Sequence, residues 1–554
     1  PMDLIRLENA GLRYGEQHLL DGVELSIGSG ERIGLLGRNG EGKSSLLAVL
    51  AGDRALDEGV RWQKPGSRIA VLEQALPERT EVSIFDYVAG GLHETGLLLQ
   101  QFAKLSVNPE ENLDALARVQ EELETVDGWR LQSTVEATLS QLALPGDKSL
   151  AELSGGWRRR AALARALVSE PDVLLLDEHT NHLDIPAIDW LEAQLQSLNC
   201  AFVLITHDRR FLRRTVTSIA ELDRGSLFRW RGDYAGFLRY REEAAQAESR
   251  ANAMFDIKLA QEERWIRQGS KARRTRNEGR VRALKDMRNE RQSRRTRQGT
   301  ARFQLDTAER SGKLVAEFRN VDHNLGGKVI LRDCTLLLER GDRVGIVGAN
   351  GAGKSTLLKL ITGELEPDSG SVRRGTKLEV AYGDQLRSQL DPQRDLIDNV
   401  CEGREYITIG GKEKHAVSYL NEFLFSPARI RTPVGTLSGG EQNRAVLAKL
   451  FSQPSNLLIL DEPTNDLDVE TLELLEERLM EYSGTLLLVS HDREFLDNVV
   501  TNLIVLPGDG SLDEQAGGYS DWEARGGGLR EATDDRKTRS ESTRLNSSHP
   551  SRSR

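Results

Sequence analysis

Short, largely apolar runs recur in both halves of the chain, and each is followed at once by glycine or by polar residues. They cover residues 32–36, 173–176 and 202–205 in the first half, and 343–347, 457–460 and 486–489 in the second. Runs of this length, bounded by turn residues, are typical of strands buried on both faces of a parallel sheet. A helical segment follows the first run in each half. The pattern predicts an α/β fold that is built twice.

Internal repeats support this duplication. The segment 37–44 recurs at 348–355, and 153–156 recurs at 437–440. Further matches join 174–184 to 458–468 and 206–209 to 490–493. Lys43 and Lys354 lie 311 positions apart, whereas Ser154 and Ser438 lie 284 apart, so the first copy holds 27 extra residues between Gln74 and Ser154. Two homologous domains follow from these matches.

The extra residues and the changes in composition set the predicted domain boundaries. Apolar positions at helical spacing between Asn108 and Leu144 predict a helical arm inserted at about 87–145. Residues 241–312 are rich in long charged helix formers, and two weak apolar stripes flank 269–279, which predicts a helical hairpin. We therefore expect a first domain at 1–240, a linker at 241–312, a second domain at 313–525 and a disordered tail at 526–554.

Composition narrows the class of protein. A chain of 554 residues with 38% hydrophobic and 29% charged residues is neither wholly disordered nor fibrous. Its three cysteines are far apart and lack metal-ligand spacing, and no stretch approaches the roughly 20 apolar residues that span a bilayer. No signal peptide is evident at the N-terminus. We expect a soluble, cytoplasmic protein without a membrane partner, acting as a monomer.

A glycine-rich loop lies between an apolar strand and a helix in each half, which is the context of a phosphate-binding loop. Glycines let backbone N–H groups surround the phosphates, the lysine reaches the terminal phosphates, and the following serine binds magnesium. We expect ATP and Mg²⁺ as ligands. The predicted ATP-binding residues are Gly37, Arg38, Asn39, Gly40, Glu41, Gly42, Lys43, Ser44 and Ser45, and Gly348, Ala349, Asn350, Gly351, Ala352, Gly353, Lys354, Ser355 and Thr356.

Paired acids end a second strand of each half. Asp177 and Asp461 are expected to hold Mg²⁺ through water, and the adjacent Glu178 and Glu462 to polarise the attacking water. Two strand-end acids that merely cap a sheet are the alternative. Ser44, Gln74, Asp177, Ser355, Gln385 and Asp461 form the predicted metal shells, since each glutamine follows its loop lysine by 31 positions.

A histidine ends a third strand in each half. His207 and His491 each lie 29 positions after the glutamate, and a histidine here donates to the γ-phosphate as charge develops. A structural role is the alternative for a lone strand-end histidine, but the repeated distance favours catalysis. Tyr14 precedes the first loop where an aromatic ring can stack on adenine, or pack as an ordinary strand residue; its counterpart is Leu325.

The segments Ser154-Gly155-Gly156 and Ser438-Gly439-Gly440, each after a leucine, resemble the signature motif of the ATP-binding cassette (ABC) superfamily. The resemblance covers residues 3 to about 525. It implies that the signature of one domain completes the ATP site of the other, in a head-to-tail sandwich that holds two Mg-ATP molecules. ATP hydrolysis then separates the two surfaces.

Two cassettes joined by a charged linker, without a membrane segment, look like the ABC-F family of ribosome-associated ATPases. The run 258–285 and Trp157 resemble its Uup subgroup, which is implicated in ribosome function and in handling branched DNA. The sequence departs from that pattern in three places. His179 stands where the family has a proline, which the second copy keeps at Pro463. Leu325 is not aromatic. The C-terminal coiled coil that binds DNA in the subgroup is missing. Residues 537–554 read as non-native sequence.

The linker is strongly basic. Residues 264–297 contain 14 Lys and Arg against Glu278, Asp286 and Glu290, and such density suits a phosphate backbone. A solvated spacer helix is the alternative, and Trp265 either stacks on a base or packs the hairpin. The residues predicted to contact nucleic acid are Arg264, Lys271, Arg273, Arg274, Arg276 and Arg280.

Three functions remain at this point. The resemblance favours an ATPase whose ATP-bound state inserts the linker and the arm into the ribosome, near rRNA and the P-site tRNA, with hydrolysis releasing it. A factor that binds and processes branched DNA in DNA repair uses the same basic surface. The ATPase subunit of an ABC transporter is the third, and the twin cassettes with a basic linker argue against it.

Overall fold

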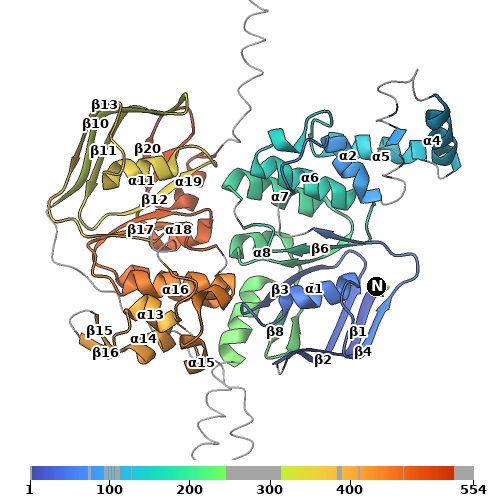
Figure 1. The fold of residues 1–554 in the computed structure, drawn as a ribbon, viewed down its shortest axis with the longest axis horizontal. Helices are drawn as coiled ribbons and strands as arrows, with labels where there is room; N and C mark the ends of the chain where they lie inside the picture. Colours follow the sequence, from blue (N-terminus) through green and yellow to red (C-terminus); the bar gives the residue numbers. More distant parts are fainter. Residues whose placement is uncertain are drawn as a thin grey trace, which may run out of the picture. The chain divides into compact units, whose positions relative to one another are not determined.

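The protein is described by a computed structural model that divides into two compact units (Figure 1). The first unit is Pro1–His179 with Leu198–Thr300, and the second is Thr180–Ser197 with Ala301–Arg554. The residues that the structure describes are 3–15, 17–72, 77–92, 96, 98, 101–102, 105, 113–125, 128–181, 183–244, 313–383, 390–409, 412–423, 425–465 and 467–529. The predicted helical hairpin of the linker and the predicted tail beyond 529 lie outside these residues.

A six-stranded sheet forms the centre of the first unit. Its order is β5-β6-β7-β3-β8-β9, and all neighbours are parallel except β8 and β9. The bounds are β3 Arg32–Gly37, β5 Ile69–Leu72, β6 Val173–Asp177, β7 Ala201–Ile205, β8 Ser218–Asp223 and β9 Ser226–Trp230. Strands β3, β6 and β7 are the three predicted from apolar runs, and their interiors are buried, as expected for strands covered on both faces.

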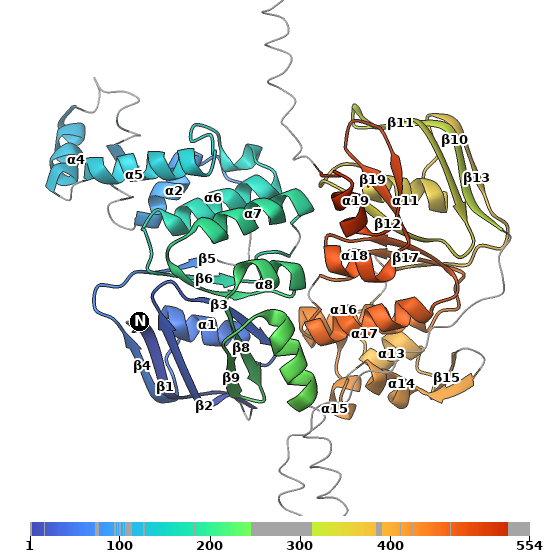
Figure 2. The same ribbon diagram turned by 180° about the vertical axis from the view of Figure 1, so that it is seen from behind.

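A second, antiparallel sheet of the first unit has the order β2-β1-β4 and is seen from behind in Figure 2. Its strands are β1 Asp3–Tyr14, β2 Gln17–Gly28 and β4 Glu58–Gln63. Helix α1 (Lys43–Ala51) joins the two sheets in one apolar core, because Leu46 and Leu50 share that core with Leu7 of β1 and Val203 of β7. This packing fixes the helix whose first residue is Lys43.

The remaining helices of the first unit lie mostly in the region of the extra residues and the signature segment. They include α2 Ile84–Ala89, η1 Gly90–Leu92, α4 Leu113–Thr125, α5 Gly128–Gln141, η3 Leu150–Glu152, α6 Gly155–Leu167 and α8 Arg209–Thr215. Val119 and Leu123 of α4 pack with Leu131 of α5 and with Leu92 and Phe102. Helices α4 and α5 therefore have a small apolar core of their own.

The second unit repeats this architecture. Its main sheet has the order β14-β17-β18-β12-β19-β20 and its antiparallel sheet the order β11-β10-β13. The bounds are β10 Leu314–Leu325, β11 Lys328–Glu339, β12 Arg343–Gly348, β13 Ser369–Arg374, β14 Val380–Tyr382, β17 Leu457–Asp461, β18 Thr485–Val489, β19 Asn502–Leu506 and β20 Asp513–Ala516. Two tandem α/β domains, as predicted from the repeated apolar runs, are confirmed.

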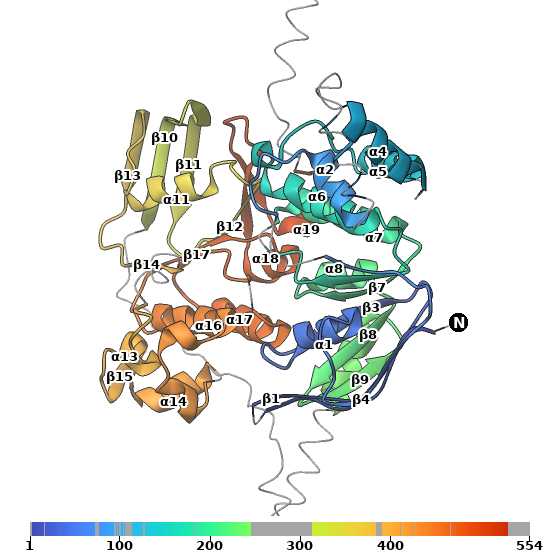
Figure 3. The same ribbon diagram turned by 45° about the vertical axis from the view of Figure 1, so that its right-hand side comes forward.

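Helix α11 (Lys354–Thr362) lies beside the antiparallel sheet of the second unit (Figure 3). Its Leu357 and Ile361 share a core with strands of both sheets. The other elements are α7 Ile185–Ser197, α13 Leu396–Cys401, β15 Tyr406–Ile409, β16 Lys412–His415, α14 Ala416–Glu422, α15 Pro427–Ile430, η4 Val434–Thr436, α16 Gly439–Phe451, α17 Val469–Glu481, α18 Arg493–Val499 and α19 Tyr519–Ala524. Strands β15 and β16 form a separate hairpin.

Helix α7 has an unusual place in the chain. It lies between β6 and β7, which are neighbours in the main sheet of the first unit, yet its contacts group it with the second unit. Ile185 belongs to the large apolar cluster of the second unit, with Phe495 and Leu496 of α18. Thr180–Ser197 therefore belongs to the second unit, although the segments before and after it belong to the first.

Candidate active sites

The phosphate loop of the first unit runs from the end of β3 into α1. Gly40 and Gly42 have φ angles of 87° and 101°, a left-handed backbone that glycine adopts without steric cost. Lys43 is buried, and its Nζ donates to the carbonyl oxygens of Gly37 at 2.7 Å and Arg38 at 3.2 Å. Because the lysine folds back over the loop at the N-terminus of α1, its charge and the helix dipole favour a bound phosphate at the same place.

Two acids end β6 beside this loop. Ser44 hydrogen bonds to Asp177, and burial raises the pKa of that carboxyl, partly offset by the serine. Asp177 Oδ1 is buried without a hydrogen-bond partner in the described part of the chain. A hydroxyl and an unsatisfied carboxylate oxygen fit a hydrated magnesium ion, which prefers oxygen ligands.

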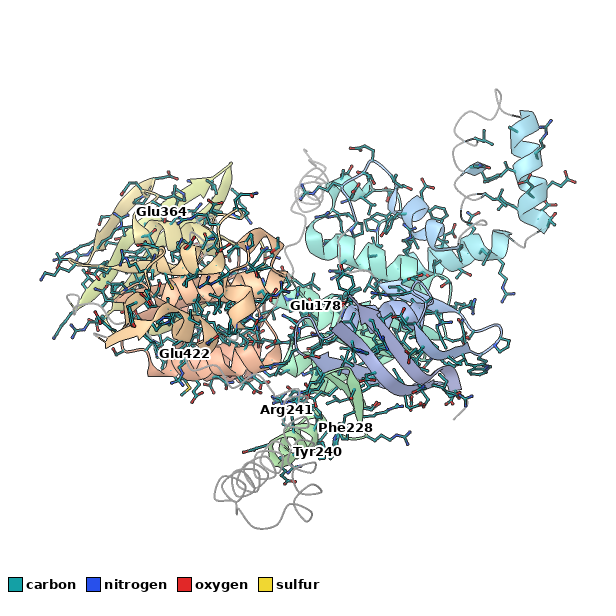
Figure 4. The ribbon with its side chains drawn as sticks, turned by 60° about the horizontal axis from the view of Figure 1, so that its bottom comes forward. Glu178, Phe228, Tyr240, Arg241, Glu364 and Glu422 are labelled. Atoms are coloured by element: carbon teal, nitrogen blue, oxygen red, sulfur yellow. The ribbon has the colours of Figure 1, made fainter. Side chains whose placement is uncertain are left out.

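Glu178 is held in a strained backbone conformation. Its φ is 42°, its N–H donates to the carbonyl oxygen of Ile205 at 3.0 Å, and His207 Nε2 lies 3.6 Å from its Oε1 (Glu178 is labelled in Figure 4). A positive φ in a non-glycine residue costs free energy and is found mainly where function needs a fixed direction. The structure thus brings Glu178 and His207 together, although they are 29 positions apart in the sequence.

The second unit has the same phosphate loop between β12 and α11. Lys354 Nζ donates to the carbonyl oxygen of Gly348 at 2.7 Å and lies 3.3 Å from His491 Nε2. The N–H of Asn350 in the loop donates to Asp184 Oδ2 at 2.9 Å. A loop amide that already binds a carboxylate oxygen is suited to bind a phosphate oxygen, since the two acceptors are similar.

The acids of the second unit lie at the end of β17. Glu462 has a φ of 49°, and its N–H donates to Val489 at 2.9 Å. The N–H of His491 donates to Glu462 Oε2 at 3.3 Å, and His491 Nε2 lies 3.3 Å from Oε1. Ser355 Oγ donates to Asp461 Oδ2 at 3.5 Å. The predicted serine, aspartate, glutamate and histidine converge in this unit as well.

Burial sets the electrostatics of the second centre. The pKa of Glu462 is raised to about 8, mainly by burial and against the lowering effect of Lys354, with Asp461 adding to the rise. Burial, with the positive charge of Lys354, holds the pKa of His491 well below its ordinary value, so the imidazole is neutral near pH 7. A carboxyl whose pKa lies near the working pH is well matched to accept a proton from water.

The two signature segments differ in how their serines are held. Ser154 is the N-cap of α6 but makes no side-chain cap hydrogen bond within the described chain. Ser438, the N-cap of α16, forms a capping box with Glu441, and its Oγ lies 3.1 Å from Glu441 Oε2. Trp157 occupies the position of Glu441 and lies under the guanidinium of Arg160 at 4.7 Å. The hydroxyl of Ser154 is therefore the less restrained of the two.

Tyr14 and Leu325 occupy matching positions at the ends of β1 and β10. Tyr14 pairs with Gln17 and Leu325 with Lys328 across their hairpins. Their exposed fractions are 72% and 54%, so neither side chain packs in a core. Packing of Tyr14 in a core is thereby excluded, whereas its stacking on adenine and its packing at the surface both remain open predictions.

His179 is completely buried and has no hydrogen-bond partner at either ring nitrogen within the described residues. Its ring meets Phe211 edge-on, with centroids 5.7 Å apart. Burial, followed by the charge of Arg159, lowers its pKa to about 3, so the ring is neutral. A buried imidazole thus replaces proline directly after Glu178.

Two side-chain clusters in the structure were not predicted from any sequence motif. Phe228 and Tyr240 stack with centroids 4.7 Å apart and planes 9° apart, next to Trp230 (Figure 4). The alternation of Phe228 and Trp230 along β9 is the sole hint of this stack. In the second cluster, Arg493 binds two acids of α7. The only sign of this cluster in the sequence is that an arginine follows each histidine by two positions, as Arg209 and as Arg493.

Several predicted residues lie outside the described residues. These are the magnesium-shell candidates Gln74 and Gln385 and the predicted nucleic-acid contacts Arg264, Lys271, Arg273, Arg274, Arg276 and Arg280. Within the described ranges, no helix is both long and apolar enough to cross a bilayer.

The geometry agrees with comparisons to known proteins. A family profile described as ABC transporter matches residues 20–181 and 331–465, and a second profile with the same description matches 220–304. The chain is 51% identical over 530 residues to the ATP-binding protein Uup of Escherichia coli, covering 95% of this chain and 83% of the relative. The Haemophilus influenzae protein of that name is also 51% identical, over 525 residues, with 94% and 81% covered.

More distant relatives extend the comparison. The energy-dependent translational throttle protein EttA of Mycobacterium tuberculosis is 37% identical over 502 residues, covering 90% of each chain. Among solved structures, the archaeal ribosome recycling factor aABCE1, in complex with ribosomal stalk protein aP1, has a TM-score of 0.58 at 18% identity, covering 96% of this chain and 98% of that one. That likeness shows the fold. The chain belongs to the ABC-F family of ATP-binding cassette ATPases, is similar to Uup over most of its length, and binds and hydrolyses ATP.

Proposed function

We propose that this ABC-F ATPase binds the ribosome in its ATP-bound state and that hydrolysis ends that state. The observation that carries the proposal is the 37% identity with EttA over 90% of both chains, because the name of that relative places it in translation. The basic segment 264–297 supports it, since 14 Lys and Arg against three acids suit contact with phosphate backbones of rRNA and tRNA.

We propose the same chemical roles in both cassettes. Glu178 and Glu462 accept a proton from the attacking water, and His207 and His491 hydrogen bond to the γ-phosphate. The serine after each loop lysine, the strand-end aspartate, and Gln74 or Gln385 hold Mg²⁺, which when bound neutralises charge on the phosphates. The signature serines contact the γ-phosphate in the ATP-bound state. The distance of 3.6 Å between Glu178 and His207 in the first unit, and the distances of 3.3 Å that join His491 to Lys354 and to Glu462 in the second, support these roles.

Trapping the ATP-bound state tests the ribosome proposal. The double variant Glu178→Gln, Glu462→Gln removes the proposed bases while it keeps the side-chain size and the hydrogen-bonding oxygen. With ATP, it is expected to sediment with 70S ribosomes more than the wild type does, and to remain in the supernatant without nucleotide. Sedimentation alone, or with branched DNA in preference to ribosomes, contradicts the proposal, and the latter outcome establishes the DNA function instead.

Charge reversal tests the basic segment. Glutamate at Arg273, Arg274 and Arg276 is expected to lower ribosome binding by at least tenfold, increasingly so at low salt, while basal hydrolysis stays largely intact. The matched control reverses Arg6, Arg319 and Arg404, three partly exposed arginines that pair with neighbouring glutamates. Equal binding losses in both triple variants overturn the role of the basic segment, because they show an effect of net charge alone.

A further inference from the structure

The side chain of Arg493 is a fully buried cation next to the second active site. Its exposed fraction is 0%, and it is the first residue of α18, two positions after His491. A cation without water requires paired acceptors, because an uncompensated buried charge is strongly destabilising. The folded protein therefore needs acceptors that pair with the buried charge of Arg493.

Two acids of α7 accept hydrogen bonds from Arg493. Nη2 donates to Glu192 Oε1 at 2.5 Å, and Nη1 donates to Asp189. Glu192 is buried, whereas Asp189 is about half exposed. The two acids are three positions apart on α7 and so project from one face of the helix, matching the two-pronged guanidinium. Lysine, with one compact ammonium group, does not satisfy both acids in this geometry.

Helix α7 also touches the phosphate loop of the second unit. Asp184, just before the helix, accepts the N–H of Ala187 with Oδ1 at 3.2 Å and the N–H of Asn350 with Oδ2 at 2.9 Å. The segment from Asp184 to Glu192 thus contacts both the loop that carries Lys354 and the helix α18. Its position affects both parts of the second site at once.

The start of α18 sets where His491 lies. Asp492 caps the helix by accepting the N–H of Phe495 at 3.0 Å, and Arg493 anchors the first turn to α7. His491 directly precedes Asp492 in the chain. Its Nε2 lies 3.3 Å from both Lys354 Nζ and Glu462 Oε1. A shift of the first turn of α18 moves this ring away from the two groups with which it is proposed to act.

We propose that Arg493, held by Asp189 and Glu192, is a positioning residue that places His491 for ATP hydrolysis at the second site. The inference rests on the proposed role of His491. It assigns to α7 the function of a brace across the second active site, with Asp184 at the phosphate loop and the two acids at α18.

Steady-state kinetics in a Glu178→Gln background, where only the second site hydrolyses, test this. Arg493→Lys and Glu192→Gln are expected to lower kcat by tenfold or more while KM for ATP stays within about twofold, because Lys354 and its loop remain in place. Arg404→Lys, which alters an exposed pair of the same unit, is the control and leaves kcat unchanged. Unchanged kcat in both Arg493→Lys and Glu192→Gln overturns the proposal.

A second variant separates positioning from packing. Arg493→Met with Glu192→Leu replaces the buried pair by apolar side chains, a change that proteins often tolerate in stability. If kcat recovers in this folded variant, Arg493 serves packing alone and the inference fails. If kcat stays low while melting is close to that of the background, positioning is supported. His491→Ala in the same background is the reference, since full activity there refutes the role of His491 itself, independently of Arg493.

Discussion

The catalytic centres of the two units agree closely in the groups expected to meet ATP and differ in the residues that support them. The loop lysine is 2.7 Å from the first glycine carbonyl in both, and Glu178 and Glu462 have φ angles of 42° and 49°. The next residue is His179 in one unit and Pro463 in the other. The lysine and glutamate thus have the same local geometry in both units, whereas the residues next to them differ.

The centres also differ in the distance between the histidine and the glutamate. His491 Nε2 lies 3.3 Å from Glu462 Oε1, whereas His207 Nε2 lies 3.6 Å from Glu178 Oε1. In the second unit Lys354 Nζ also lies 3.3 Å from His491 Nε2, and Arg493 of α18 hydrogen bonds to Asp189 and Glu192 of α7. The second site therefore has the shorter distance between its histidine and its glutamate.

Removing both glutamates gives the largest expected effect and tests what the two centres share. Glu178→Gln with Glu462→Gln is expected to lower ATP turnover by about 10²–10⁴-fold, the usual contribution of a general base. ATP binding, measured by filter retention, is expected to persist, since the loop lysines are intact. Glu366→Gln, at an exposed position, is the control. Turnover within tenfold of the wild type contradicts the assignment of both glutamates.

The buried Glu462 predicts a pH dependence of stability that belongs to the second unit. Its pKa of about 8 lies above the ordinary value of 4.5, so the stability tied to its protonated form is present below about pH 4.5 and is lost as pH rises through 8. Glu462→Gln is expected to melt several degrees above the wild type at pH 9, and the gap is expected to shrink by pH 5. A constant difference in melting temperature across this range contradicts the burial argument.

The exchange of His179 and Pro463 tests the most visible difference between the units. His179→Pro removes two buried nitrogens that lack partners within the described residues, each of which costs about 1–3 kcal/mol. We expect it to raise the free energy of unfolding by about 1–2 kcal/mol, allowing for lost contact with Phe211. Pro463→His is expected to lower it by a similar amount. Urea denaturation checks both, and destabilisation by His179→Pro shows that the imidazole is well accommodated.

The helix caps give the smallest expected effect. Glu441→Ala removes one half of the capping box at Ser438 and is expected to cost about 1 kcal/mol. Trp157→Glu supplies the missing half beside Ser154 but removes the contact with Arg160, so its net effect is expected to stay within about 0.5 kcal/mol. Equal costs in the two units, measured by urea denaturation, argue that the caps do not distinguish them.

The sequence indicates that the candidate catalytic residues lie together, because they directly follow buried strands of one sheet. Strands of a parallel sheet share one carboxyl edge, so Glu178 and His207 are expected together once β6 and β7 are recognised from their apolar runs. The repeat then supplies the second site at fixed offsets. Local pattern and tertiary position coincide at these residues.

The supporting contacts depend on tertiary structure that no local pattern encodes. Asp189 and Glu192 look like ordinary charged positions on α7, and their partner Arg493 lies about 300 positions away. The apolar periodicity also gives no sign that Thr180–Ser197 makes its contacts in the second unit. The sequence gives no sign that His179 is buried either, because its burial depends on tertiary contacts such as the one with Phe211 of α8.

The pH–rate profile of the Glu178→Gln variant tests whether the buried Glu462 accepts the proton at the second site. Only the second site hydrolyses there, and kcat/KM reports the free enzyme. We expect kcat/KM to rise about tenfold per pH unit below the pKa of Glu462 and to level off near pH 8. A profile that is flat between pH 6.5 and 9 contradicts the claim that a buried Glu462 is the proton acceptor of the second site.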